Sequence, residues 1–202
     1  MTDPLPPWPA TAPASGRVVL RPFEDHDVTM VRELSTDPYV PLIGTLDACC
    51  DEAGALAYID RQHSRYREGT GYSFAIAENE SGRALGMIGL WLRDRTRGRA
   101  RGRAQAGYAV VPSMRGRSVG TDALRALIPF AWGFPELHRL ELHIEPSNAA
   151  SFAVAERAGF SHEGVLRSYQ EIGGRRRDLA SYALVRALQH STGATDVRSS
   201  KK

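Results

Sequence analysis

Residues 107–134 combine a short strand pattern, a basic glycine turn and an apolar helix pattern, and this order limits the possible folds. Aromatic and β-branched residues at 108–111 favour a strand, and Pro112 ends it because proline cannot donate to a sheet. From Thr121 onward, apolar residues recur at the spacing of one helix face. These apolar residues are Leu124, Leu127, Ile128 and Ala131. The pattern therefore predicts a strand, a tight loop and a helix.

The loop between this strand and this helix favours an anionic ligand. Gly116 and Gly120 allow a sharp turn and a close approach of the backbone to a ligand. The first amides of the following helix have no partner within it, and such amides attract anions. Arg115 and Arg117 add positive charge beside them. We expect a ligand that carries phosphate; the alternative is an ordinary turn with incidental arginines.

Two common phosphate-binding loops do not fit this spacing. A Walker loop needs GxxxxGK[ST], whereas Gly116 and Gly120 are one residue too close and Thr121 and Asp122 follow. A Rossmann loop needs GxGxxG and an acidic residue about 20 positions later. The stretch from Arg115 to Gly120 instead resembles the [QR]xxGx[GA] motif of the GNAT superfamily of N-acyltransferases. Its serine, Ser118, stands where that family usually has glycine, and a serine resists positive φ.

The resemblance extends over residues 17–188, and its second half is similar to the subgroup that contains RimJ and RimL. The matching residues of the NxxSxxxxExxGF pattern are Asn148, Ser151, Glu156, Gly159 and Phe160. The resemblance implies an α/β GNAT fold: a single domain with a mixed, mostly antiparallel, splayed central sheet and helices on both faces. We expect this domain at 16–189, after a disordered proline-rich arm (1–15) and before a disordered tail (190–202).

Local patterns add the expected elements. Helices are predicted between Asp25 and Asp37, at 52–67, from Thr121, and from Asn148 to Gly159. Strands are predicted at 17–21, 71–78, 83–92, 108–111, 139–145, 165–172 and 178–186. Trp91, at the end of one strand, either faces the cleft or belongs to the core. Trp8 either docks on the domain or shares the disorder of the arm.

The resemblance implies that acetyl-CoA donates an acetyl group to a primary amine by direct attack in a ternary complex. The residues expected to bind acetyl-CoA are Tyr108, Ala109, Val110, Arg115, Gly116, Arg117, Ser118, Val119, Gly120, Thr121 and Asn148. Among them, the Val110 amide is expected to hold the thioester oxygen. No metal is expected.

The resemblance also gives candidate catalytic residues. His143 lies five residues before Asn148, where some relatives carry a glutamate base, and histidine titrates near neutral pH. Glu141, on the same strand face, is the reserve. Ser151 is the expected proton donor to the departing thiolate, because Ala155 occupies the position of the usual tyrosine. A hydrogen-bonded structural histidine remains the alternative for His143.

The acceptor stays open at this point. A protein N-terminus and a small-molecule amine, such as an antibiotic or an aminoacyl compound, both fit. A non-catalytic acyl-CoA-binding module is a further alternative. Six alternating arginines at 93–103 could also guide RNA or a ribosome surface, although a solvated hairpin tip is the favoured interpretation.

Composition places further bounds on the chain. Its 202 residues and net charge of +3 suit one globular domain with no strong case for nucleic-acid binding. No apolar run reaches the ~20 residues of a membrane span, and the start lacks the pattern of a signal peptide. Cys49 and Cys50 are adjacent, which suits neither a disulfide framework nor a metal site. We expect a cytoplasmic protein, and the resemblance adds a possible homodimer.

Overall fold

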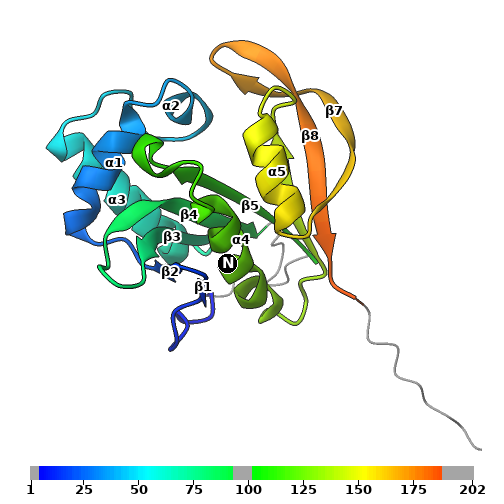
Figure 1. The fold of residues 1–202 in the computed structure, drawn as a ribbon, viewed down its shortest axis with the longest axis horizontal. Coiled ribbons are helices and arrows are strands. Elements are labelled where there is room, and N and C mark those ends of the chain that lie inside the picture. The colour runs from blue at the N-terminus through cyan, green and yellow to red at the C-terminus, as the bar shows by residue number, and fades with distance from the viewer. Residues whose placement is uncertain (1–4, 93–101, 188–202) are drawn as a thin grey trace, which may run out of the picture.

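The computed structural model describes residues 5–92 and 102–187. Within these ranges, eight strands form one open sheet in the order β1-β2-β3-β4-β5-β6-β8-β7 (Figure 1). The strands are β1 (Ala14–Ser15), β2 (Val18–Arg21), β3 (Gly71–Glu78), β4 (Ala84–Leu92), β5 (Arg103–Val110), β6 (Arg139–Ile144), β7 (Ser161–Ile172) and β8 (Arg175–Val185). The β5–β6 pair is parallel, and the other pairs are antiparallel. The expected mixed, mostly antiparallel sheet is confirmed.

Helices cover both faces of this sheet. They are α1 (Val28–Ser35), α2 (Val40–Ile43), α3 (Glu52–Arg67), α4 (Val119–Trp132) and α5 (Ala149–Arg157), with short 3-10 turns at Asp25–Asp27 and Pro112–Met114. The α3 bounds equal the predicted ones, because the side chain of Asp51 accepts a hydrogen bond from the Gly54 amide at 2.8 Å and fixes the first turn.

Strand β3 lies in the middle of the core. All of its residues except the last are buried, so helices must pack on both of its faces. The rings of Tyr72 and Phe74 lie 4.9 and 5.3 Å from the ring of Phe130 in α4. Because side chains alternate along a strand, Ser73 points to the opposite face, against which α3 packs. The sheet is therefore the middle layer between α3 and α4.

Strands β5 and β6 diverge after a short paired stretch, and this divergence makes room for a site. Residues Arg103–Gln105 of β5 pair with Arg139–Glu141 of β6. Strand β5 then continues to Val110 without pairing to β6. The Val111 amide donates to the Leu85 carbonyl of β4 at 3.0 Å. Since antiparallel bonds alternate, the Val110 N–H points away from β4 and into the opening. The expected splay of the sheet is present.

The N-terminal segment differs from the disordered arm expected at 1–15. Leu5 is buried, and the Trp8 ring lies 5.0 Å from the Phe74 ring in an edge-to-face arrangement. The Tyr72 hydroxyl donates to the Pro6 carbonyl at 2.6 Å. Burial of these apolar side chains outweighs the extended tendency of the prolines, so residues 5–15 pack on the domain.

Other expectations fall outside the described ranges. These are the start of the arm (1–4), most of the arginine-rich segment (93–101) and the predicted tail (190–202). Among the helices that the structure describes, none has the length and apolarity needed to cross a membrane.

Candidate active site

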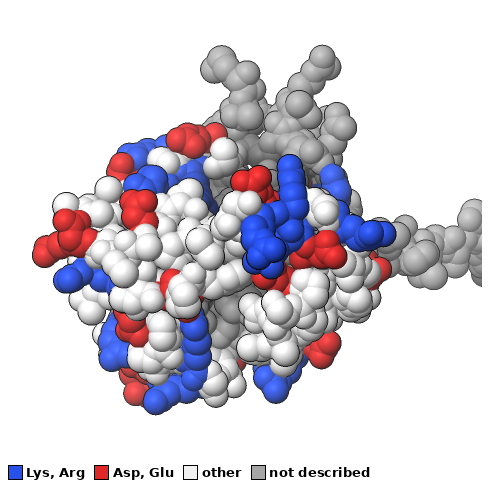
Figure 2. Space-filling model, turned by 90° about the horizontal axis from the view of Figure 1, so that it is seen from above, with Lys and Arg blue, Asp and Glu red and all other residues white. Residues whose placement is uncertain are grey.

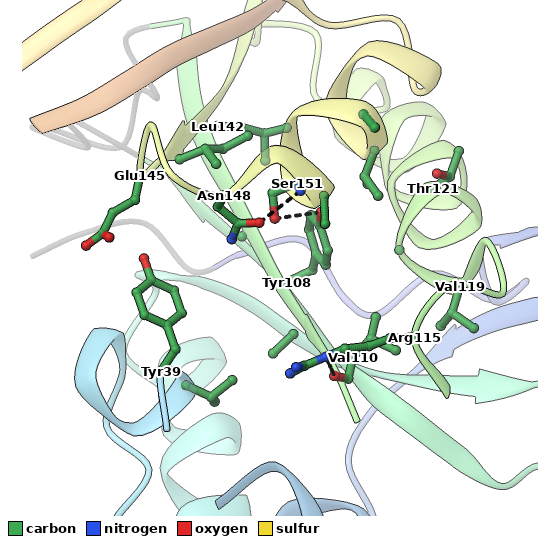
Figure 3. A pocket seen from close by; sticks show the side chains of 18 of the residues that line it. Tyr39, Tyr108, Val110, Arg115, Val119, Thr121, Leu142, Glu145, Asn148 and Ser151 are labelled. Atoms are coloured by element: carbon green, nitrogen blue, oxygen red, sulfur yellow. Dashed lines mark hydrogen bonds between the residues drawn. The ribbon is translucent and has the colours of Figure 1, made fainter. Parts of the chain in front are cut away.

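A cavity of about 670 Å³ lies where β5 and β6 diverge (Figure 3). Ten predicted cofactor-binding residues line it: Tyr108, Ala109, Val110, Arg115, Gly116, Ser118, Val119, Gly120, Thr121 and Asn148. Two predicted catalytic residues, His143 and Ser151, also line it. The structure does not bring Arg117 or Glu141 to this wall: Arg117 is exposed, and Glu141 borders a second hollow of about 500 Å³. The α2 segment closes another side of the cavity through Tyr39, Val40 and Ile43.

The loop before α4 presents backbone amides to this cavity. Gly116 has φ 74°, and a Cβ built there meets no atom within 4 Å. Ser118 has φ 62° and precedes the first residue of α4. The serine therefore adopts the left-handed conformation that we expected it to resist, at about 1–2 kcal/mol of local strain. The first bond of the helix runs from the Asp122 amide to the Ser118 carbonyl at 2.9 Å, so earlier amides lack a helical acceptor and suit an anion.

Tyr108 connects this helix start to α5. A Cβ at Gly120 would lie 2.9 Å from the Tyr108 ring, so only glycine allows this contact without movement. The Tyr108 hydroxyl donates to Ser151 Oγ at 3.3 Å, and the Ser151 amide donates to the Asn148 side chain at 3.0 Å. Burial raises the pKa of the Tyr108 phenol, and the bond to Ser151 offsets part of that increase. Two hydroxyl groups thus lie side by side on the cavity wall (Figure 3).

The Tyr108 phenol is a candidate that sequence reasoning missed, because only the backbone of this residue was expected to act. Strand alternation could have identified it. Tyr108 lies two positions before Val110, so its side chain lies on the same face of β5 as that of Val110.

Arg115 binds protein groups on both sides of the cavity. Its Nε donates to the Val110 carbonyl at 3.1 Å, and its Nη2 donates to Asp37 Oδ2 at 2.6 Å. The other oxygen of Asp37 accepts from the Tyr39 and Val40 amides at 2.7 and 2.9 Å. Burial acts to raise the pKa of the Asp37 carboxyl, but the Val40 and Tyr39 amides and the Arg115 guanidinium together lower it.

Strand β6 turns its polar side chains to the face opposite α4 and α5. His143 has an 8% exposed side chain, its Nε2 lies 4.0 Å from Glu141 Oε2, and its ring lies 5.1 Å from the Tyr169 ring. Glu141 accepts from Arg139 Nε at 2.5 Å. His143 therefore reaches the cavity wall, whereas the reserve base Glu141 is held by an arginine outside it.

Tyr39 and Glu145 face each other across the cavity, and sequence reasoning named neither as a site residue (Figure 3). Burial, and then the charge of Glu145, raise the pKa of Tyr39 to about 12. Oε1 of Glu145 is buried and has no hydrogen-bond partner among the described residues. The alternation of β6 that pointed to His143 also applies to Glu145. The segment that carries Tyr39, however, lies over 100 positions away in the sequence.

Among the residues that the structure describes, no group of three or more His, Cys, Asp or Glu side chains is placed to hold a metal ion. The arrangement offers amides for a phosphate, a strand edge for an extended ligand, and hydroxyl, imidazole and carboxylate groups for proton transfer.

Comparisons with known proteins identify the family of the chain. A family model described as the acetyltransferase (GNAT) domain matches residues 17–161. Over 170 residues the chain is 26% identical to the uncharacterized N-acetyltransferase p20 of Bacillus licheniformis, covering 84% of this chain and 93% of that protein. The structure of Mycobacterium smegmatis RimJ in complex with CoA-disulfide is similar, with a TM-score of 0.70, 26% identity, and coverage of 86% and 84%.

A further structure shares the fold alone. The acetyltransferase MccE, solved with acetyl-CoA and AMP, is 18% identical, with a TM-score of 0.69 and coverage of 84% of this chain and 92% of that one. The chain therefore belongs to the GNAT family of acetyltransferases, for which acetyl-CoA is the acyl donor.

Proposed function

We propose that this N-acetyltransferase acts on the α-amine at the N-terminus of a polypeptide. The observation that carries the proposal is the wall of the cavity on the acceptor side, which is an open apolar rim. Ile43 of α2 lines the cavity and is 40% exposed, and its neighbour Leu42 is 51% exposed. Tyr169 of β7, which borders the second hollow, is 49% exposed. Pockets for small molecules usually enclose their ligand, whereas an open apolar rim suits an extended chain.

The surface around the cavity supports this acceptor. The first residues of β8, directly after the β7–β8 turn, are the exposed Arg175, Arg176 and Arg177. A Cβ at Gly173 in this turn would lie 3.5 Å from the Leu42 side chain, so the turn and α2 come close together. The surface is hollowed between the α2 side and the hairpin side, and basic side chains border the hollow (Figure 2). Over 105 residues, 52% of this chain, the sequence is 33% identical to the putative ribosomal N-acetyltransferase YdaF of Bacillus subtilis, and that name favours a polypeptide acceptor.

The residues on the α4 side fit the acyl donor. We propose that the amides at the start of α4 bind its pyrophosphate, and that the loop glycine Gly116 gives the phosphates room. Exposed Arg117 adds positive charge at the mouth. The Val110 N–H, directed into the opening, is suited to hold the thioester oxygen, an effect usually worth about 3 kcal/mol. Acetyl-CoA supplies the activated acetyl group.

The remaining residues manage two protons. We propose that His143 takes a proton from the acceptor ammonium, so that the neutral nitrogen can attack the acetyl carbonyl carbon. The C–S bond then breaks, and Ser151, bonded to the Tyr108 hydroxyl, gives a proton to the thiolate. The nitrogen loses its second proton to this hydroxyl pair, which restores Ser151. The products are an amide and CoA thiol. Holding both substrates in one cavity supplies the largest part of the rate increase, about 7–11 kcal/mol at best.

The test is an acetylation assay with acetyl-CoA and three acceptors: a peptide with a free N-terminus, the same peptide with a blocked N-terminus, and a panel of small amines. We expect CoA release with the free peptide alone, and mass spectrometry should place the acetyl group on its first residue. A kcat/KM for a small amine about tenfold above that of every peptide would overturn the proposed acceptor.

A calorimetric titration with acetyl-CoA provides the matching binding experiment. Binding should be lost when Arg117→Ala is combined with Gly120→Asp, because the second change drives a charged side chain into the Tyr108 ring. Binding of acetyl-CoA without CoA release for any amine would instead indicate a non-catalytic module.

A further inference from the structure

The carboxylate of Glu145 lies at the acceptor end of the cavity. Glu145 follows the last residue of β6, and Pro146 follows it. Its side chain is only 13% exposed and contributes to the cavity wall. Strand alternation places it on the same face as His143, about 7 Å further along the chain. The carboxylate is thus within reach of an acceptor that approaches His143.

Glu145 lacks a donor for a buried oxygen atom. Its Oε1 has no hydrogen-bond partner among the described residues, and its ion-pair contact with Nε of Arg177 is 3.9 Å long, beyond hydrogen-bonding distance. A buried carboxylate oxygen without a donor is strongly unfavourable unless a ligand or solvent supplies one. The position therefore favours a ligand that carries N–H donors and positive charge.

The other carboxylates near the cavity already have their donors. Asp37 accepts from two backbone amides and from Arg115, and Glu141 accepts from Arg139. Neither has the same capacity to accept a bond from a substrate. Among the described carboxylates that line the cavity, Glu145 is the one with a buried oxygen still open to a donor.

Tyr39 completes the arrangement from the other side. Figure 3 shows its hydroxyl directed towards the Glu145 carboxylate. The Asp37 carboxylate fixes the backbone of Tyr39, because it accepts a hydrogen bond from the Tyr39 amide at 2.7 Å. With its pKa near 12, the phenol stays neutral at physiological pH, so its oxygen can accept a hydrogen bond from a cation. An ammonium group has three N–H donors, enough for Glu145, Tyr39 and one further acceptor.

We infer that Glu145, together with the Tyr39 hydroxyl, binds the ammonium group of the acceptor and selects cationic amines. This inference rests on the proposed function, since it assigns the acceptor end of the same cavity. The protonated amine first binds at Glu145 and Tyr39, and His143 then removes a proton before the nitrogen attacks. Glu145 is thereby a specificity residue that contacts the substrate, and it does not itself need to change protonation state.

The test compares Glu145→Gln with wild type. Glutamine keeps the shape of the side chain and removes its charge. We expect the acceptor KM to rise about tenfold or more, while the KM for acetyl-CoA changes less than about twofold. Calorimetry with the acceptor peptide and the enzyme saturated with CoA should show the same loss of affinity. The matched control is Glu163→Gln, because this carboxylate has its own donor, Arg139, and lies outside the cavity.

A second ligand separates charge recognition from packing. A peptide whose N-terminal amine is replaced by hydrogen should bind wild type and Glu145→Gln equally weakly. An unchanged acceptor KM in Glu145→Gln would overturn the inference, and so would an equal loss of affinity for the amine and des-amino peptides. If wild type acetylates only small amines, the polypeptide acceptor is overturned. In that case a tenfold KM increase for the small amine supports the role of Glu145, and an equal KM rejects it.

Discussion

The guanidinium of Arg115 donates to the carboxylate of Asp37 at 2.6 Å and so joins the loop before α4 to the loop before α2. The first loop borders the proposed donor site, and the second carries Tyr39 of the proposed acceptor site. Arg115 also donates to the Val110 carbonyl, which lies next to the amide expected to hold the thioester oxygen. One ion pair therefore fixes parts of both substrate sites.

Replacing Asp37 with asparagine should weaken both sites and the fold. We expect higher KM values for acetyl-CoA and for the acceptor. We also expect a free energy of unfolding about 1–2 kcal/mol lower at pH 7, because the Arg115 bond and one amide acceptor are weakened. Steady-state kinetics and urea unfolding measure the two effects. Asp60→Asn is the control, since Asp60 forms an exposed ion pair with Arg67 far from the cavity lining.

The stability effect of Asp37 should depend on pH in a defined direction. Burial acts to raise the pKa of this carboxyl, but its hydrogen bonds lower the folded-state pKa below the ordinary value of 3.8. The stabilisation is thus complete above about pH 3.8 and is lost as the pH falls through the folded-state pKa. A difference between wild type and Asp37→Asn that stays constant from pH 7 to strongly acidic pH would contradict this account.

Ser118 should be a site where glycine stabilises the protein. Its φ of 62° is strained for serine, so Ser118→Gly should raise the free energy of unfolding by about 0.5–1 kcal/mol after the added chain entropy is counted. Gly116→Ser is the converse change. Its φ of 74° would strain a serine, and a new Cβ would meet no atom within 4 Å, so the effect would come from the backbone alone. It should lower stability by about 1 kcal/mol. Thermal unfolding tests both, and equal shifts in one direction would contradict the strain argument.

The Tyr108 and Ser151 hydroxyl groups should act as one unit. Ser151→Ala and Tyr108→Phe should each lower kcat about 10–100-fold, because each interrupts proton delivery to the thiolate. The double variant should lose little more than either single variant, and CoA affinity should stay unchanged in Ser151→Ala. Single-turnover kinetics and calorimetry provide these values. Fully additive losses would show that the two hydroxyl groups act independently, and unchanged turnover would remove Ser151 from the mechanism.

The sequence predicted those features that depend on local order. The spacing of apolar residues predicted α3, and the glycines around Arg117 identified the loop before α4. The alternation of β6 correctly separates His143 from its buried neighbours. Each of these features depends on residues a few positions apart, where helix and strand periods are decisive.

Features that join distant segments were not predicted. Tyr39 and Glu145 are 106 positions apart and meet only because α2 and the end of β6 border one cavity. For Trp8 the sequence left docking and disorder open, because the rings of Tyr72 and Phe74 against which it packs lie more than 60 positions away. Ser118 shows a different reason: the surrounding strand and helix impose a backbone angle that the residue alone disfavours.

His143 provides the prediction that decides how the acceptor loses its proton. Its imidazole lines the cavity, and histidine accepts a proton near neutral pH, so kcat/KM for the wild type should fall on the acidic side as the base becomes protonated. His143→Gln should lower kcat about 100-fold at pH 7 and abolish this acidic limb. The measurement is the pH–rate profile of wild type, His143→Gln and Glu141→Gln, with the amine acceptor held constant.

Glu141 serves as the comparison because it lies on the same strand face. Arg139 is bound to it, and its carboxylate lies 4.0 Å from His143. An acidic limb that persists in His143→Gln but disappears in Glu141→Gln would identify the carboxylate as the base. A limb that persists in both would mean that the acceptor loses its proton directly to solvent, and His143 would then be a structural residue held between Glu141 and Tyr169.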